Sequence, residues 1–307
     1  MTQPLQANLK GLSMAPAEAI VDAARVAAVE YAVSKSILND CMSSHNVVED
    51  FCYSYRDWIL STHNNSIKGL DKFTTLGYSN GTSESFDKFY LQNHNRRFRC
   101  FRGEYMYHRL AWDLHKFSWA YIDDEPIVVN DAVVISLPFA DTGWKHAGHT
   151  QQFLDRCYEL GVPVLVDCAF FGICAAVEFD FDHPAITDIC FSLSKTAPVN
   201  LLRIGLRFTR PGFQDSLQVY HDSQYVNKLG ASVGLTVLNN IGPDDTFEIW
   251  RHRQLEFCSQ MNLEPSNTVI FGIDCNHAYD KYSRGSADTN RICFSKYFVG
   301  GELPVNE

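Results

Sequence analysis

The amino-acid sequence predicts an α/β fold, in which a large domain with a mainly parallel sheet is joined to a smaller α/β domain. From about residue 70, short apolar runs rich in β-branched residues alternate with helical stretches. This alternation is typical of a parallel sheet that helices cover on both faces. After residue 215 the pattern changes to a long helical stretch and two further strands, which indicates a second, smaller unit.

This change of pattern sets the expected domain boundaries. The large domain is expected to span residues 70–212, and the N-terminal segment 1–69 would join residues 213–307 in the smaller domain. Residues 1–15 are expected to form a loose arm, and the Ala-, Glu- and Val-rich stretch 16–42 a helix. The other expected helical regions cover 83–95, 147–160 and 213–262, and the expected strands cover 73–78, 126–130, 132–137, 162–167, 188–192, 202–208, 268–273 and 291–295.

The composition of the 307-residue chain argues against several classes of function. Its formal charge of −10 is unfavourable for binding a nucleic acid or an anionic membrane. No apolar run reaches the ~18 residues that a transmembrane helix needs, and no signal peptide is apparent at the N-terminus. The ten cysteines form no CxxC pair, so we expect reduced thiols, no metal site and a cytoplasmic protein.

Two charged residues follow apolar strands, at the end of a parallel sheet where ligands usually bind. Asp167 ends the run Val-Leu-Val-Asp, and Lys195 ends Ser-Leu-Ser-Lys, just after the strand 188–192. A carboxylate at a buried strand end needs a cationic or hydrogen-bonding partner. A helix cap or a salt bridge would satisfy Asp167, and Lys195 could lie on the surface. Alternatively, Lys195 is a catalytic amine whose pKa is lowered by partial burial.

Two further features indicate a site for an anion. Arg203 lies in the apolar stretch Leu-Leu-Arg-Ile-Gly, eight residues after Lys195, and an arginine with apolar neighbours needs a fixed anion. Gly81, Thr82 and Ser83 follow a strand and open a helix, so backbone N–H groups and two hydroxyls could bind a phosphate. A capping motif would look similar. Together and in this order, these groups fit one ligand, pyridoxal 5′-phosphate (PLP).

Over most of its length the chain resembles the fold-type I PLP-dependent enzymes, especially the class I and II aminotransferases. Their Asp-x-Ala-Tyr element is matched by residues 167–170, and their Ser-x-x-Lys element by residues 192–195. Arg203 with the following Ile-Gly matches the family arginine, and residues 81–83 match the phosphate loop. The resemblance implies a three-layer aminotransferase-like fold with PLP as the cofactor. The residues that it assigns to cofactor binding are Gly81, Thr82, Ser83, Tyr105, Asp167, Ala169, Phe170, Ser192, Ser194, Lys195 and Arg203.

The resemblance also implies roles for individual residues. Lys195 would be the Schiff-base lysine and the general acid and base, and Asp167 would keep the ring nitrogen of the cofactor protonated. Tyr105, in Gly-Glu-Tyr-Met-Tyr, resembles the aromatic residue that stacks on the ring. Arg291, in Asn-Arg-Ile-Cys-Phe-Ser, resembles the arginine that binds the α-carboxylate of the substrate.

The sequence departs from the family near the 3′-oxygen of the cofactor. Phe170 stands where the family has a tyrosine, and Leu137 is expected where the family has an asparagine. Loss of these two partners should raise the pKa of the imine between the lysine and the cofactor. Ser136 or Asp141 could compensate. The chain is also short for this family, so its N-terminal arm and smaller domain are expected to be trimmed.

The resemblance implies an aminotransferase that acts on an amino acid and a keto acid, as a homodimer with a shared active site. The same aspartate, lysine and arginine would serve a PLP-dependent lyase, cyclase or decarboxylase, which is the alternative. A non-catalytic PLP-binding protein is a third reading, but residues 1–70 show no basic helix-turn-helix and Lys195 is present. Neither a nucleic acid nor a membrane is expected as a partner.

Overall fold

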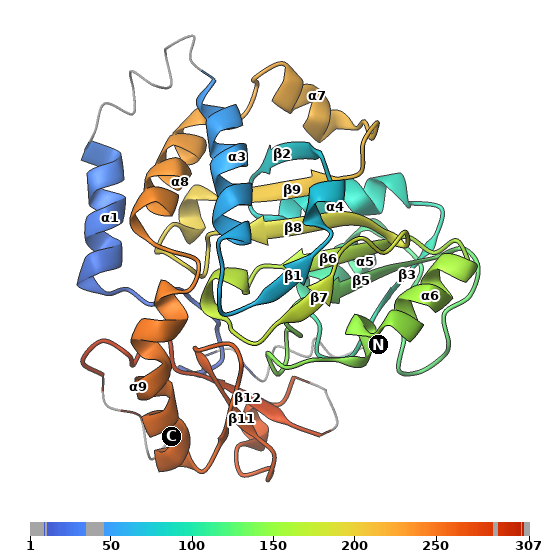
Figure 1. Cartoon of the computed structure of the whole chain (residues 1–307). Coiled ribbons are helices and arrows are strands. Elements are labelled where there is room, and N and C mark those ends of the chain that lie inside the picture. Colours follow the sequence, from blue (N-terminus) through green and yellow to red (C-terminus); the bar gives the residue numbers. More distant parts are fainter. Residues whose placement is uncertain (1–8, 10, 35–45, 285–287, 302, 304–307) are drawn as a thin grey trace.

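The computed structural model describes residues 9, 11–34, 46–284, 288–301 and 303 (Figure 1). Its centre is a seven-stranded sheet, mainly parallel, which lies between helices. Among its described strands, Gly205–Thr209 alone runs against the others, because it is antiparallel to both of its neighbours, Thr75–Ser79 and Ile186–Ser192. The order across this sheet is β2 (Thr75–Ser79), β9 (Gly205–Thr209), β8 (Ile186–Ser192), β6 (Val164–Cys168), β5 (Asp131–Ser136), β3 (Arg97–Cys100) and β4 (Trp119–Tyr121).

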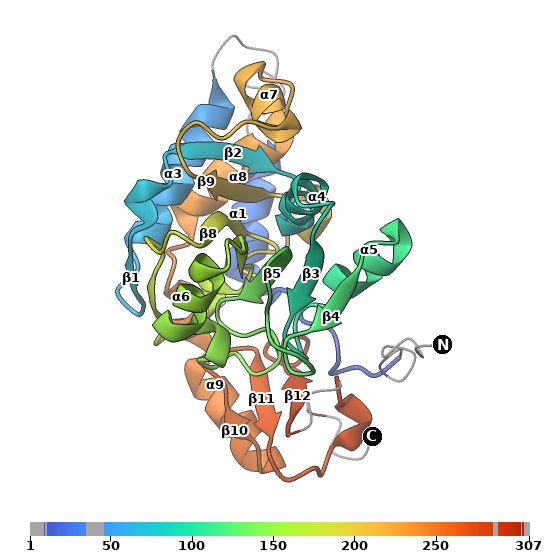
Figure 2. The same ribbon diagram turned by 90° about the vertical axis from the view of Figure 1, so that its right-hand side faces the viewer.

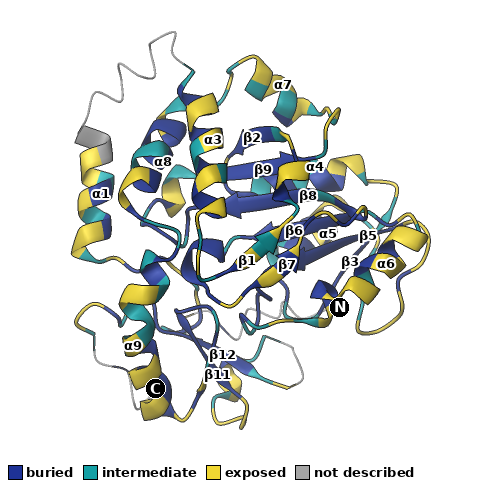
Figure 3. Ribbon diagram, viewed as in Figure 1, coloured by how far each residue is buried: buried dark blue, intermediate teal, exposed yellow. Residues whose placement is uncertain are grey.

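Helices cover both faces of the sheet and give it three layers, with the sheet buried and the outer helix faces exposed (Figure 3). Along β5, Val133 and Ile135 join the core on one face, whereas Ala132 and Val134 join the core on the other. Burial on both faces explains why the central strands are apolar at most positions. The first face packs against α3 (Val47–Leu60), α6 (Gln151–Glu159) and α8 (Lys228–Asn240), and the second against α4 (Thr82–Gln92) and α5 (Tyr107–His115).

A smaller unit lies below the large sheet in Figures 1 and 2. It has its own apolar core, which includes Phe257, Phe271 and Phe294, and the N-terminal segment adds Met14 and Ile20 to it. Its antiparallel strands are β10 (Glu264–Pro265), β11 (Phe271–Asp274) and β12 (Asn290–Cys293), and its helix is α9 (Asp245–Met261). The remaining elements are α1 (Ala23–Ser34), α7 (Ser216–Asp222) and the parallel pair β1 (Ser66–Lys68) and β7 (Glu178–Asp180).

The predicted α/β fold class is confirmed, and all but one of the expected strands are present within a few residues. The exception is 126–130, which forms a turn in which Val128 and Val129 are exposed. Pro126 has no N–H to donate to a sheet, and its carbonyl accepts a hydrogen bond from the side chain of Arg99 instead. At the edge of the sheet β3 pairs with β4 instead. Neither strand was expected, because β3 contains two arginines and β4 has only three residues.

The N-terminal expectations need correction. Within the expected helix 16–42 only α1 is helical, and residues 35–42 lie outside the described part of the chain. The described part of the expected loose arm is packed: Met14 is buried, and its carbonyl accepts a hydrogen bond from the N–H of Cys293 at 2.8 Å. The stretch 213–262 forms three separate helices, α7, α8 and α9. The domain boundaries at 69/70 and 212/213 stay a prediction.

The described residues also bear on the cysteines and on membrane insertion. Cys52, Cys100, Cys157, Cys168, Cys174, Cys190, Cys258 and Cys293 are free and buried, as expected, whereas Cys275 is free and exposed. Within the described ranges, none of the helices combines the length and the apolar character that a membrane crossing requires.

Candidate active site

A cavity of about 310 Å³ lies at the carboxyl ends of the central strands. Ser136, Asp167 and Ser192 reach it from the ends of β5, β6 and β8, the usual position of ligands in open α/β sheets. The N-terminal segment adds Pro16 and Ala17 to its wall, and the smaller unit adds Arg291. All of the predicted site residues except Gly81 line this one cavity. The lining residues are Pro16, Ala17, Thr82, Ser83, Gly103, Glu104, Tyr105, Ser136, Ala140, Asp167, Ala169, Phe170, Ser192, Ser194, Lys195, Arg203, Arg284 and Arg291.

One corner of the cavity is suited to a phosphate-sized anion. Gly81 is the N-cap of α4, so the free N–H groups of the first helical turn begin here. The guanidinium of Arg203 donates from Nη2 to Ser83 Oγ at 2.8 Å. Gly81 has φ +75°, and a Cβ at this position would lie 2.3 Å from Arg203 Nη2. Glycine is therefore needed both for the backbone conformation and for the close approach of the arginine.

Lys195 presents a half-buried amine to the same cavity. Its Nζ donates to the backbone carbonyl of Ala17 in the N-terminal segment. Burial lowers the pKa of Lys195 from 10.5, and the charges of Arg291 and Arg203 act in the same direction. A larger fraction of the amine is therefore neutral, and hence nucleophilic, than on an exposed lysine.

Asp167 is a buried carboxyl group with few partners of its own. Among the described residues, its Oδ1 accepts one hydrogen bond, from the backbone N–H of Ala169 at 3.0 Å. Burial raises the pKa of Asp167 to about 7, although the Ala169 N–H and the charge of Lys195 lower it. A cationic N–H group in the cavity would therefore be a favourable partner for Asp167.

A second carboxyl group, Glu104, lies beside Asp167. Its Oε1 accepts the N–H of Ser136 at 2.9 Å, and its Oε2 accepts the hydroxyl of the same serine. Burial raises the pKa of Glu104 to about 8, and the charges of Asp167 and Asp141 act in the same direction. The hydroxyl of Ser136 also accepts the N–H of Ala140 at 2.7 Å, which places this pair at the start of the loop after β5.

The remaining predicted cofactor residues surround these groups. Tyr105 lines the cavity with 49% of its surface exposed, and its ring is stacked at 6.2 Å on that of Tyr107. The hydroxyls of Ser192 and Ser194 lie 2.8 Å apart. Phe170 meets the ring of Phe271 edge-on at 5.2 Å and offers the cavity no hydroxyl. Thr82 and Ala169 complete the predicted set on the cavity wall.

Arg291 reaches the cavity from β12 of the smaller unit. Its Nη1 donates to the carbonyl of Ala140, and its guanidinium lies 4.3 Å from the centre of the Phe271 ring. Burial lowers the pKa of Arg291 to about 9, and the positive charge of Arg284 contributes. Because a buried guanidinium is costly without an anion, this arrangement is suited to binding a carboxylate.

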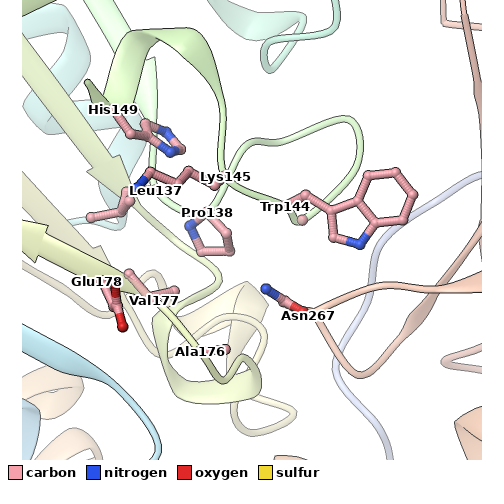
Figure 4. Close-up of a pocket in the computed structure, with 10 residues that line it drawn as sticks. Leu137, Pro138, Trp144, Lys145, His149, Ala176, Val177, Glu178 and Asn267 are labelled. Carbon is pink, nitrogen blue, oxygen red and sulfur yellow. The ribbon is translucent and has the colours of Figure 1, made fainter. Parts of the chain in front are cut away.

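Leu137 does not line the cavity, contrary to its expected alignment with the family asparagine. It borders a separate hollow of about 50 Å³, together with Trp144 and Lys145 (Figure 4). The residue of this loop that lines the cavity is Ala140. Neither Ala140 nor Phe170 can therefore supply a side-chain hydrogen bond there.

Several cavity residues were not predicted from the sequence. Arg284 lies in the polar stretch 280–290, where nothing distinguishes it from a surface arginine. Ala17 contributes through its backbone carbonyl, which no side-chain pattern reveals. The sequence does indicate Glu104 in one way, because this acidic residue directly precedes Tyr105, the residue predicted to stack on the cofactor.

Comparison with known proteins gives information at the level of the fold. No protein-family model matches the chain, and no curated protein sequence matches it. Solved structures do match. A PLP-bound C-S lyase from Staphylococcus hominis has a TM-score of 0.69 at 12% identity, over 94% of this chain and 90% of that one. A tyrosine aminotransferase from Leishmania infantum has a TM-score of 0.66 at 12% identity, over 96% and 94%.

A third example widens the range of chemistry on this architecture. The L-threonine-O-3-phosphate decarboxylase from Porphyromonas gingivalis has a TM-score of 0.63 at 12% identity, over 91% of this chain and 93% of that one. An aminotransferase, a lyase and a decarboxylase thus share one chain topology, and identity this low does not select among their reactions. The three-layer core and the smaller unit give this chain the aminotransferase-like fold of the fold-type I PLP-dependent enzymes.

Proposed function

We propose that this chain is a PLP-dependent enzyme that acts on an amino acid, and that its reaction is transamination. The observation that supports the proposal most directly is that Lys195, Asp167 and Arg203 line one cavity. The fit to PLP follows from the chemistry of these groups. Arg203, Ser83 and the start of α4 would bind the phosphate, and Asp167 would accept the proton of the ring nitrogen.

The residues of the chain suggest how the reaction proceeds. Bound PLP would supply an electron-accepting ring attached to the amino group of the substrate. Arg291 would hold the α-carboxylate and so orient the bond from Cα to hydrogen. Lys195 would anchor the cofactor through Nζ, and after release it would move the proton from Cα as general base and acid. Tyr105 would cover the ring, and the smaller unit would exclude water from the site.

The anchoring lysine can be tested by chemical trapping. The protein would be mixed with PLP, reduced with borohydride and digested, and the peptides would be analysed by mass spectrometry. We expect a reduced PLP adduct on Lys195 in the wild type and none in Lys195→Ala. Lys145→Ala is the matched control, because Lys145 lines the separate hollow in Figure 4, and it should retain the adduct. If the wild type shows no adduct on Lys195, the proposed function is wrong.

The products then distinguish transamination from the other reactions. Transamination predicts release of a keto acid and formation of the aminated cofactor in equal amounts when single amino acids are added. The lyase, cyclase or decarboxylase alternative is favoured by Phe170 and Ala140, which leave the 3′-oxygen without the family's hydrogen-bonding partners. It predicts ammonia, a cyclised product or carbon dioxide, with the cofactor regenerated in each cycle.

We also propose that the enzyme is a homodimer whose subunits share the active site. This proposal rests on the resemblance, in which a second subunit completes the cavity. Dilution of the protein provides the test. Because a dissociated subunit would lack the partner's part of the site, the activity per subunit should fall as dilution lowers the fraction of dimer. Light scattering would give the mass of the assembly independently.

A further inference from the structure

A second arginine in the cavity has no role in the proposed reaction. Arg284 lines the same cavity as Arg291 but lies outside β12, in the segment that leads to this strand. It is not part of the phosphate corner, which is formed by Arg203 and the start of α4. The smaller unit therefore presents two guanidinium groups to the cavity, whereas a single α-carboxylate needs only one.

The hydrogen bonds of the two arginines leave donor groups unused. Arg284 donates from Nη2 to the carbonyl of Ala15, and Arg291 donates from Nη1 to the carbonyl of Ala140. Both acceptors are neutral backbone groups. Nε of each arginine is buried and has no hydrogen-bond partner among the described residues. Buried donors of this kind are costly unless a ligand satisfies them.

The charges at this end of the cavity are also unbalanced. Among the described residues, neither guanidinium forms a salt bridge with a carboxylate, although the charge of Asp141 raises the pKa of both arginines against the effect of burial. Burial lowers the pKa of both arginines, which reflects the cost of holding these cations away from water. One substrate carboxylate would give a single guanidinium its anionic partner, and a second anionic group would do the same for the other.

We propose that Arg284 and Arg291 together select an amino acid that carries a second anionic group, a carboxylate or a phosphate, on its side chain. Arg291 binds the α-carboxylate, and Arg284 binds the second anion from the same subunit. The inference rests on the proposed function for the orientation of the substrate. The paired anion site itself can be measured on the protein without its cofactor, so the two proposals can fail separately.

The first experiment compares two probes of equal chain length, succinate and butyrate, on the cofactor-free protein. Their affinities would be measured by calorimetry or from the rise in melting temperature, at constant ionic strength. The wild type should bind succinate on the order of tenfold or more tightly than butyrate, because a second charge-assisted contact forms. Equal affinities in the wild type would overturn the proposal.

Variants assign the second carboxylate to Arg284. Arg284→Gln keeps a donor for the carbonyl of Ala15 but loses the charge, so it should lose the preference for succinate while butyrate affinity stays unchanged. Arg291→Gln should weaken both probes. Arg203→Gln should still bind succinate more tightly than butyrate. If this variant loses the preference for succinate, the probe binds at the phosphate corner and the proposal is wrong. Arg253→Gln, on the exposed side of α9, controls for loss of a positive charge elsewhere.

Two other results would also contradict the proposal. If Arg284→Gln weakens succinate and butyrate equally, both arginines bind one carboxylate. If this variant keeps the succinate preference, Arg284 only anchors the N-terminal segment through Ala15. Should Arg284→Gln fail to fold, Arg284→Lys provides the same test. It lacks the planar guanidinium fork, so it should bind succinate less tightly than the wild type with unchanged butyrate affinity.

The second experiment uses the PLP-loaded protein and records the change in the cofactor spectrum during a single turnover. Aspartate, glutamate and O-phosphoserine should react at lower concentrations than alanine and leucine, and Arg284→Gln should remove the difference. The carboxylate and phosphate substrates distinguish the two kinds of second anion. If PLP fails to bind but the succinate preference is present, the anion site stands while the proposed function fails.

Discussion

The two ends of β5 carry buried polar residues with opposite electrostatic surroundings. At its first residue, Asp131 accepts hydrogen bonds from Arg99 at 2.5 Å, from Arg97 at 2.9 Å and from the N–H of Val128 at 2.9 Å. At its last residue, Ser136 contacts Glu104 and pairs in register with Asp167 on β6. Among the described residues, neither of these two carboxyl groups forms a salt bridge.

This difference separates a structural network from a ligand site. The carboxylate of Asp131 has its counter-ions and donors within the chain, so it needs no further partner. Asp167 and Glu104 are equally buried but have raised pKa values, of about 7 and about 8, chiefly because of that burial. A buried carboxyl group without a counter-ion among the described residues is a candidate for a functional site, whereas equal burial with full pairing is not.

The largest effect should come from Asp167→Asn in the PLP-loaded protein. Loss of the carboxylate removes the partner of the ring proton, so proton removal from the substrate should slow by roughly 10²–10³-fold. Single-turnover spectra with a reactive amino acid would measure this rate. Asp180→Asn, at the exposed end of β7, is the control and should react at the wild-type rate. An unchanged rate in Asp167→Asn would remove Asp167 from the mechanism.

The same substitution at the other end of β5 should affect stability instead. Asp131→Asn leaves the fully buried guanidinium of Arg99 without its carboxylate, which should cost about 3–5 kcal/mol of unfolding free energy. Urea unfolding of the cofactor-free protein at pH 8 would measure the loss. Asp167→Asn should not be destabilised in this assay. If both variants lose equal stability, the contrast between the two ends is wrong.

A smaller effect is expected for Glu104→Gln, and it depends on pH. Between pH 4.5 and about 8 the unfolded chain loses the Glu104 proton, whereas the folded protein keeps it. The wild type should therefore lose stability as the pH rises through this window, with the loss complete above it. Glu104→Gln lacks this loss and should gain roughly 3 kcal/mol relative to the wild type between pH 4.5 and pH 7. Urea unfolding of both proteins at several pH values would test this prediction. If the unfolding free energies of the variant and the wild type change equally with pH, the prediction is wrong.

The smallest effect is expected at the phosphate corner. Gly81→Ala places a methyl group at φ +75° and against the guanidinium of Arg203, so Arg203 must move. The affinity for inorganic phosphate should fall about tenfold, since a charge-assisted contact is displaced. Calorimetry of the cofactor-free protein would measure it. Gly212→Ala also has a positive φ but open space around its Cβ, so it should leave phosphate binding unchanged.

The sequence predicts the fold because its central strands are buried on both faces, and such strands are recognisable as continuous apolar runs. It also predicts that Asp167 and Lys195 lie in one cavity, because parallel strands bring their ends to one edge. It does not predict β3, whose arginines pair with Asp131 from another strand. Contributions from irregular segments, such as the carbonyl of Ala17 and the side chain of Arg284, depend on long-range packing that no local pattern encodes.

The hydrogen bonds that the carbonyls of Met14 and Ala15 accept have a consequence for biosynthesis. These carbonyls are among the first described groups to leave the ribosome, whereas their partners, Cys293 and Arg284, are among the last. The central sheet can pair earlier, since its last strand ends at Thr209. In a nascent chain the strands of the sheet can therefore pair before Arg284 and Cys293, the partners of the N-terminal segment, have been synthesised. Premature termination after α8 would leave the sheet with its helices on both faces, but without the wall that the smaller unit gives the cavity.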